Sequence, residues 1–405
     1  MPPRRHRDDA ERRVIQSLSG TSARREAATE GVRALVDEVD ETTLVTLLKR
    51  LNMLVLIGGR LVALGLTDLP ELDRELESHR AIVHGWGVIT EFTALDVLDQ
   101  LNGAGIRAMP LKGSILARQL YGDVAARTSR DIDVLVAPDD LARAVSTVEA
   151  LGWHWRSDVA RSDGLPLLHE TLVHPSLPRI ELHWRVHWYE RRFAADALAR
   201  AVRPTPNAPL EMQPLDGLIA LMLFYARDGF TGLRFAADAA AWWDTKCAGG
   251  NGPTPTEVVA ERYPELVAPV TVAAGVLEQL VGIPSLRPRV APLRWRLAAG
   301  LASPFVEGGR LQAEANAGLI DLLLAPPRAA GDALRRVMRN APADESEAPP
   351  APRWSAVVSH VLRVARRWTL AVVPAIPRAC GLSRSGWSAV PPVARPTLRR
   401  PRRSS

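Results

Sequence analysis

Two aspartates that stand two positions apart in an apolar segment carry the most specific chemistry of this chain. Asp131 and Asp133 belong to the run Asp-Ile-Asp-Val-Leu-Val, whose β-branched residues predict a strand. Because strand side chains alternate between faces, we expect both carboxylates on one side of that strand. A buried carboxylate pair needs a cation, and Mg²⁺ is a hard ion that binds carboxylates together with substrate phosphates. The alternative is that the pair is simply the solvent-facing side of an edge strand.

An apolar segment upstream of the aspartates runs into Lys112-Gly113-Ser114, and helical spacing follows from Ile115 to Tyr121. This order predicts a strand, a tight turn and the start of a helix. The free backbone N–H groups and positive dipole of a helix start suit a phosphate group. Gly113 would allow close approach of the backbone, and Ser114 could cap the helix or contact a phosphate oxygen. An ordinary strand–helix connection with a serine cap would show the same pattern.

A third carboxylate lies in the run Arg-Ile-Glu-Leu-His-Trp-Arg-Val of residues 179–186, where Glu181 and His183 share one strand face. If this strand pairs beside the strand of the aspartates, Asp131, Asp133 and Glu181 converge. Three carboxylates can hold two Mg²⁺ ions, which clamp the two oxygens of an in-line phosphoryl displacement. His183 would then either orient Glu181 or be a packed structural histidine. Glu181 could equally be a surface glutamate on an amphipathic strand.

The order of these motifs resembles that of the polymerase-β-like nucleotidyltransferases, and most closely an uncharacterised bacterial nucleotidyltransferase family of that superfamily. The matching stretches are Leu-Lys-Gly at 111–113 followed by Tyr121, Arg127 and Arg130 before Asp-Ile-Asp at 131–133, Glu-Leu-His-Trp at 181–184, and Leu-Arg-Phe-Ala-Ala-Asp at 233–238. The resemblance covers the chain from the region of residue 30 to that of residue 325. It departs from the family where a frequent histidine is replaced by Tyr225.

The resemblance implies an α+β fold, with a small mixed β-sheet nucleotidyltransferase core flanked by N-terminal and C-terminal helical subdomains. It implies a two-metal transfer of an NMP group from an NTP donor to a hydroxyl-type acceptor. The metal ligands and catalytic residues would be Asp131, Asp133 and Glu181, with two Mg²⁺ ions or with Mn²⁺ in their place. The nucleotide-binding candidates are those of the turn and the two arginines before the aspartates, namely Lys112, Gly113, Ser114, Arg127 and Arg130.

Two other functions use the same residues. One is a different metal-dependent phosphoryl enzyme, a phosphoesterase or a kinase, built on the same acids. The other is a non-catalytic nucleotide-binding scaffold. Four charged residues further along, Arg227, Asp228, Arg234 and Asp238, would either line the cleft or form structural ion pairs.

The positive charge of the chain is confined to its C-terminal end. After Glu347 there are eleven arginines and no acidic residue, so this end of the chain carries a charge of +11. Because the whole chain has a net charge of +6, residues 1–347 carry a net charge of −5. A long nucleic-acid groove on the body is therefore unexpected, because such grooves need clustered cations. An acceptor on a small molecule or peptide fits better, and its identity is not readable from the sequence.

The cysteines and the apolar stretches indicate the cellular compartment in which the protein works. Cys247 and Cys380 form neither a disulfide framework nor a metal pattern, which favours a reducing compartment. The Arg-rich N-terminus lacks the apolar core of a secretory signal, and no stretch of about 20 apolar residues lacks charges. We therefore expect a cytoplasmic protein with no transmembrane segment.

The organisation along the chain follows from composition and periodicity. We expect a frayed N-terminus over 1–30, a helical N-terminal subdomain over 31–101, the nucleotidyltransferase core over 102–190, a helical C-terminal subdomain over 191–325, and a Pro/Arg-rich basic tail over 326–405. Within the tail, residues 354–373 can form an amphipathic helix. It would dock on the body, on a protein partner or on an anionic membrane surface.

Overall fold

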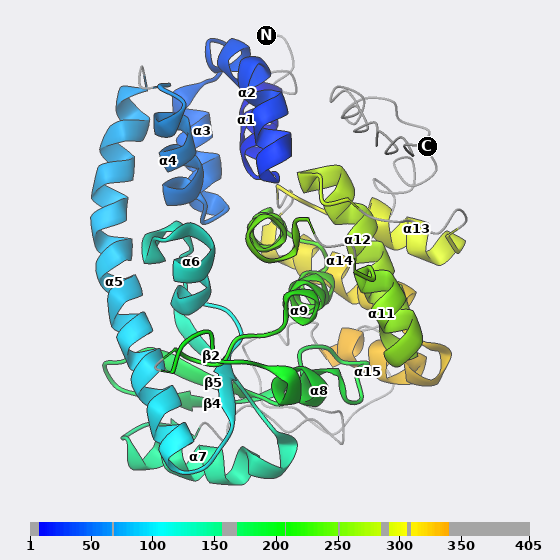
Figure 1. The fold of residues 1–405 in the computed structure, drawn as a ribbon. Coiled ribbons are helices and arrows are strands. Elements are labelled where there is room, and N and C mark those ends of the chain that lie inside the picture. Colours follow the sequence, from blue (N-terminus) through cyan, green and yellow to red (C-terminus); the bar gives the residue numbers. More distant parts are fainter. Residues whose placement is uncertain are drawn as a thin grey trace, which may run out of the picture.

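The computed structural model describes residues 8–66, 69–155, 168–206, 208–249, 252–284, 291–305 and 309–339 (Figure 1). Five helices precede the first strand: α1 (Asp8–Leu18), α2 (Ser22–Val36), α3 (Glu41–Arg50), α4 (Leu54–Ala63) and α5 (Pro70–Gly103). Asp40 caps α3, because its side chain accepts a hydrogen bond from the backbone N–H of Thr43 at 2.9 Å. Pro70 begins α5, a position at which proline loses no helical hydrogen bond.

The N-terminal segment differs from the expectation that residues 1–30 are frayed. Helix α1 is folded from Asp8, and its residues Val14 and Ile15 are completely buried. The backbone N–H of Thr21 donates to the carbonyl of Val281 at 2.8 Å, which ties this segment to the C-terminal helices. Helices α1 and α2 carry many charges, but each also has an apolar face that packs into the core. Residues 1–7 lie outside the described part of the chain.

Helix α5 spans the molecule, from the N-terminal helices to the β-sheet (Figure 1). Near its end, Val97, Leu98 and Leu101 are buried against the sheet. Its middle part instead exposes Ile82 and Phe92 to solvent. This helix therefore connects the N-terminal helices rigidly to the strands that carry the aspartates.

The sheet has five strands in the order β1-β2-β5-β4-β3. The strands are β1 (Ala108–Pro110), β2 (Asp131–Val136), β3 (His154–Trp155), β4 (His169–Val173) and β5 (Arg179–His183). Strands β2 and β5 pair in parallel, and all other neighbours pair antiparallel. Helix α6 (Ser114–Tyr121) lies between β1 and β2, and α7 (Leu141–Ala150) follows β2. A small mixed sheet flanked by helices confirms the predicted α+β fold class.

The two faces of the sheet have different environments because side chains alternate along each strand. On one face Ile132, Val134 and Leu182 pack with α5 and α7 in an apolar cluster. On the other face Leu135 joins the large core formed with the C-terminal helices. Asp131 and Asp133 have the same parity as Leu135, so they face the C-terminal helices.

The C-terminal part of the described chain is helical. It comprises α8 (Phe193–Arg200), α9 (Pro214–Arg227), α10 (Arg234–Trp242), α11 (Pro255–Arg262), α12 (Val267–Val281), α13 (Leu293–Gly300), α14 (Gly309–Leu324) and α15 (Ala330–Arg339). Short 3-10 turns are η2 (Val124–Ala126), η3 (Pro138–Asp140), η5 (Pro264–Leu266) and η6 (Pro327–Ala329), and η4 (Trp243–Cys247) is a π-helical extension of α10. Helix α9 is apolar on nearly all sides and lies at the centre of this group (Figure 1). Gly217 of α9 leaves room for the Trp242 ring, which any side chain there would overlap.

The beginning of the expected tail belongs to the folded body. Helix α15 packs on α14, and Nη2 of Arg336 lies 2.8 Å from Oδ2 of Asp321. The boundary expected at residue 326 is therefore placed too early. The predicted amphipathic helix over 354–373 lies outside the described residues.

Two helical stretches have the length and hydropathy of a membrane span by composition alone, namely α5 and Pro264–Val281. In the second stretch 61% of the apolar window is buried within the fold, and in α5 33% is buried. Core helices of folded domains have the same composition, so this is weak evidence for a span and leaves the expectation of no transmembrane segment in place.

Candidate active site

The parallel pairing of β2 and β5 brings three carboxylates together. Asp133 stands directly opposite Glu181 in the register, and Asp131 lies two positions earlier on the same face. One carboxylate oxygen from each of the three lies within 4.8 Å of the others. The structure thus places Asp131, Asp133 and Glu181 in one cluster, on the sheet face that α9 covers.

Asp133 is the most buried of the three, with a side chain that has no exposed surface. Its Oδ1 lies 2.7 Å from Nζ of Lys112 and 3.0 Å from Nε2 of His183. Burial alone would raise the pKa of Asp133, but the Lys112 ammonium and the His183 hydrogen bond outweigh it and hold the pKa well below its usual range. Its second oxygen, Oδ2, is buried and has no hydrogen-bond partner among the described residues.

Asp131 is partly buried at the start of β2. Its Oδ1 accepts a hydrogen bond from Oγ of Ser129 at 2.9 Å, and its Oδ2 accepts one from Nη2 of Arg179 at 3.2 Å. Burial and the neighbouring Asp133 raise the pKa of Asp131. Lys112, Ser129 and Arg179 lower it by more, so the net shift of the pKa is downward. Both aspartates are therefore ionised at neutral pH, as cation ligands must be.

Glu181 lies between two histidines. Its Oε2 is 3.4 Å from Nε2 of His183 and 3.8 Å from Nε2 of His169. Burial raises the pKa of Glu181, but the hydrogen bond with His183 lowers it below the usual value. His183, expected either to orient Glu181 or to be a packed structural histidine, is completely buried and lies nearer to Asp133 (3.0 Å) than to Glu181 (3.4 Å).

His169 is a site residue that the sequence reasoning missed. It stands opposite His183 in the β4–β5 register, with the two ring centroids 4.7 Å apart. Burial, followed by the neighbouring His183, lowers the pKa of His169 to about 4, so its imidazole is neutral at neutral pH. The run His-Glu-Thr-Leu-Val of residues 169–173 shows no apolar–polar alternation, so no local pattern marked His169; its place beside Glu181 follows from the pairing of β4 with β5.

The predicted phosphate turn is present between β1 and α6. Gly113 has φ of +87°, a conformation that glycine adopts without strain, and it occupies the N-cap of α6. Ser114 is the first helical residue and not the cap, which excludes the simple serine-cap alternative. A small gap between this turn, β2 and α5 is lined by Lys112 to Ser114 and by Thr90, Ala94 and Leu98. The ion pair between Lys112 and Asp133 joins the turn to the carboxylates on the other face of the sheet.

The two arginines before β2 lie in different environments. Arg127 is buried, and its Nε lies 2.7 Å from Oδ2 of Asp238 on α10. Burial lowers the pKa of Arg127, but Asp238 raises it by more. Its guanidinium therefore forms a buried ion pair with Asp238, while its Nη2 is buried without a hydrogen-bond partner among the described residues. Arg130 is exposed next to Asp131.

The charged residues between positions 227 and 238 divide into two groups. Asp238 forms the structural pair just described, and Nη1 of Arg234 donates to the carbonyl of Thr128 at 3.0 Å. These bonds fix the loop that leads to the aspartates. Arg227 instead lies near the site, with its guanidinium carbon 5.0 Å from the centre of the Phe224 ring, and its charge contributes to the low pKa of His169. Tyr225 is buried and its hydroxyl donates to the carbonyl of Gly232, away from the carboxylates.

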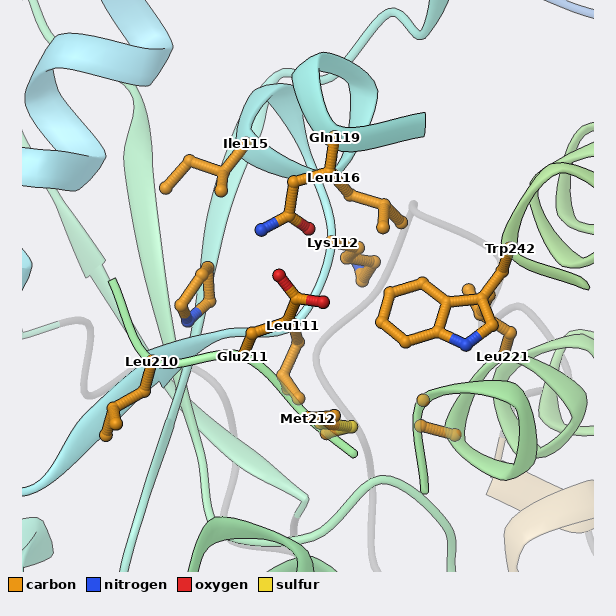
Figure 2. A pocket seen from close by; sticks show the side chains of 13 residues that line it. Leu111, Lys112, Ile115, Leu116, Gln119, Leu210, Glu211, Met212, Leu221 and Trp242 are labelled. Carbon is orange, nitrogen blue, oxygen red and sulfur yellow. The ribbon is translucent and has the colours of Figure 1, made fainter. Parts of the chain in front are cut away.

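A second pocket is also lined by Lys112, the residue that contacts Asp133. It lies between α6, α9, α10 and the segment 210–212. Figure 2 shows the side chains of Gln119 and Glu211 directed into it, with the Trp242 indole along one wall. Glu211 is paired with Lys246, whose Nζ is 2.6 Å from Oε1. The pocket combines apolar walls with a few polar groups, as small-molecule sites do.

The donor set fits hard divalent ions. Three ionised carboxylates offer oxygen ligands, which Mg²⁺ and Mn²⁺ prefer. The buried Oδ2 of Asp133 has no partner in the described part of the chain, and a metal ion would satisfy it. Asp131, Asp133 and Glu181 can therefore hold such ions.

Comparison with known proteins identifies the family. No curated protein matches the chain. A family model described as "Uncharacterised nucleotidyltransferase" matches residues 37–257, more than half of the chain and all of the site residues described above. The chain therefore belongs to this family of nucleotidyltransferases, which are transferases of phosphorus-containing groups.

Proposed function

We propose that this protein transfers an NMP group from an NTP to a hydroxyl-type acceptor on a small molecule or peptide, with two Mg²⁺ ions. The observation that carries the proposal is the register of β2 and β5, which sets Glu181 opposite Asp133 beside the Gly113 turn. Mn²⁺ would bind the same oxygen ligands.

Each part of the site has a role in this reaction. When bound, the two ions supply electrostatic stabilisation of the attacking and leaving oxygens. Asp131, Asp133 and Glu181 hold them, and Arg179 positions two of these carboxylates, because its Nη2 lies 3.2 Å from Asp131 and 3.5 Å from Glu181. The turn at Gly113 presents helix N–H groups to the β- and γ-phosphates.

Lys112 is placed to serve both the carboxylates and the triphosphate. Its ammonium contacts Asp133, and its stem lines the pocket of Gln119, Glu211 and Trp242. We assign that pocket to the non-reacting part of one substrate, the nucleoside or the acceptor. Its position beside Lys112 supports this assignment.

Product analysis separates this function from its alternatives. The protein would be incubated with each NTP, Mg²⁺ and candidate acceptors, and the products analysed by mass spectrometry. An acceptor heavier by one NMP group, together with free pyrophosphate, is the expected result. Free inorganic phosphate would identify a phosphoesterase, and an acceptor heavier by one phosphate group would identify a kinase. Nucleotide binding without any product would identify a scaffold.

The acceptor class, the cellular location and the docking of the basic tail are also part of this proposal. The net charge of −5 over residues 1–347 supports an acceptor other than long nucleic acid. We propose a cytoplasmic location, with the basic tail docking on a protein partner or an anionic membrane surface. The arginine-rich composition after Glu347 supports such docking.

A further inference from the structure

His169, Glu181 and His183 form a second group of ligand-type side chains next to the aspartates. They come from the antiparallel pair β4 and β5, where His169 stands opposite His183. One ligand atom from each of the three residues lies within 4.8 Å of the others. Glu181 therefore belongs both to this group and to the group of three carboxylates.

The separations within the group match those around a tetrahedral ion. Two ligand atoms that each lie about 2.1 Å from one tetrahedral ion are about 3.4 Å apart. Oε2 of Glu181 is 3.4 Å from Nε2 of His183 and 3.8 Å from Nε2 of His169. Three ligands could therefore close on one ion with small side-chain movements.

The environment of the group also suits an ion with an open coordination position. The His183 side chain is completely buried, and that of Glu181 is 12% exposed. The His169 side chain is 31% exposed, so one side of the group faces solvent. Catalytic zinc sites commonly combine three protein ligands with one open position.

The two groups differ in the ions that they favour. Carboxylate oxygens suit Mg²⁺ and Mn²⁺, whereas imidazole nitrogens suit Zn²⁺ and other first-row transition ions. We propose that His169, Glu181 and His183 form a site for a divalent transition ion of the Zn²⁺ type, which shares Glu181 with the carboxylate site. This proposal rests on the proposed function only in its use of Glu181 as a shared ligand.

Binding would redirect one hydrogen bond. Nε2 of His183 now lies 3.0 Å from Oδ1 of Asp133, so it carries the proton of that hydrogen bond. As an ion ligand, Nε2 must present its lone pair, and the imidazole then carries its proton on Nδ1. Asp133 keeps a cationic partner throughout, because Nζ of Lys112 is 2.7 Å from the same oxygen.

The test measures ion binding without nucleotide, on the tag-free full chain after removal of metals by a chelator. Calorimetric titration with ZnCl₂ should give one tight site per chain, and Co²⁺ should give the visible absorption of a histidine-ligated ion. His169→Ala should weaken Zn²⁺ binding at least about tenfold and remove that absorption. His154→Ala is the matched control, because His154 lies exposed on strand β3 of the same sheet, and it should bind Zn²⁺ like the wild type.

A second variant separates the two sites. Asp131→Asn removes a carboxylate ligand but leaves all three members of the histidine group, so it should weaken Mn²⁺ binding and keep the tight Zn²⁺ site. Equal Zn²⁺ affinity in wild type and His169→Ala would overturn the proposal, as would loss of Zn²⁺ binding in Asp131→Asn but not in His169→Ala. This test measures Zn²⁺ binding without turnover, whereas the product analysis measures nucleotide transfer. A failure of the zinc proposal can therefore be told apart from a failure of the proposed function.

Discussion

Nζ of Lys112 lies 2.7 Å from Oδ1 of Asp133, so a lysine of the turn before α6 neutralises the most buried carboxylate of the site. The Asp133 side chain has no exposed surface, and that of Lys112 is only 12% exposed. An incoming divalent cation would compete with Lys112 for the same negative charge, and an incoming triphosphate would compete with Asp133 for the lysine. Binding of the two is therefore expected to be mutually favourable.

Replacing Lys112 by methionine should reveal this competition. Without bound ions, the variant leaves Asp133 without its ammonium partner, which should lower the free energy of unfolding by about 3 kcal/mol. Added Mn²⁺ should then raise the melting temperature more in Lys112→Met than in the wild type. The measurement is thermal unfolding with and without Mn²⁺.

Lys49 provides the matched control for that experiment. It pairs with Glu75 at 2.5 Å on the surface, where both side chains are about two-fifths exposed, so Lys49→Met should change stability by less than about 1 kcal/mol. The same Mn²⁺ response in the wild type and both variants would show that Lys112 does not compete with metal ions.

Arg127 and Asp238 should behave as a structural pair. Their side chains are 2% and 1% exposed, and removing one partner leaves the other buried without its counter-charge. Arg127→Met should therefore lower the free energy of unfolding by about 3–5 kcal/mol in urea denaturation. If the variant kept wild-type stability and lost only NTP binding, Arg127 would be a phosphate ligand instead.

Glu190 should make stability depend on pH. Burial raises its pKa to about 8, and the backbone N–H of Val186, which donates to Oε1 at 3.1 Å, only partly offsets that effect. Because the folded pKa exceeds the unfolded one, the folded state binds more protons between about pH 4.3 and 8. The stabilisation from Glu190 is therefore full below that window and is lost as the pH rises through it.

His187 acts in the opposite direction, since burial lowers its pKa to about 3. Above the ordinary histidine pKa of about 6.5, His187 is neutral in both the folded and the unfolded state and no longer changes stability with pH. The change in stability from about pH 6.5 to 8 therefore reports mainly on Glu190. Unfolding free energy should fall by about 2 kcal/mol over that interval in the wild type. Glu190→Gln keeps an acceptor for Val186 and should flatten the slope, and an unchanged slope would contradict the assignment to Glu190.

The sequence predicted the elements of the site better than its contacts. Alternation along single strands was enough to place Asp131 with Asp133 and Glu181 with His183, because that property is local. The parallel register that sets Asp133 opposite Glu181 joins residues 48 apart in sequence, and from the sequence the pairing of these two strands was only a hypothesis. His169 was missed because its neighbours across β5 are decided by sheet order, which a single strand does not encode.

Tertiary pairing also explains the other differences. Arg127 precedes the aspartates in sequence, but Asp238, 111 residues later, determines where its guanidinium points. The charges of α1 suggested a frayed end, whereas Val14 and Ile15 are buried in the core that α1 shares with α2, α3 and α12. Sequence patterns describe one element at a time, and these partners belong to other elements.

The central claim is that Asp131, Asp133 and Glu181 hold the divalent ions that support nucleotide transfer. Its most direct test is transfer of the labelled α-phosphate of an NTP, with Mg²⁺, by the wild type and Asp133→Asn. Asp139→Asn is the control, because Asp139 is an exposed aspartate just beyond the same strand. We predict that Asp139→Asn keeps wild-type transfer and that Asp133→Asn loses it by about a thousandfold or more. Transfer by Asp133→Asn at the wild-type rate would contradict the account.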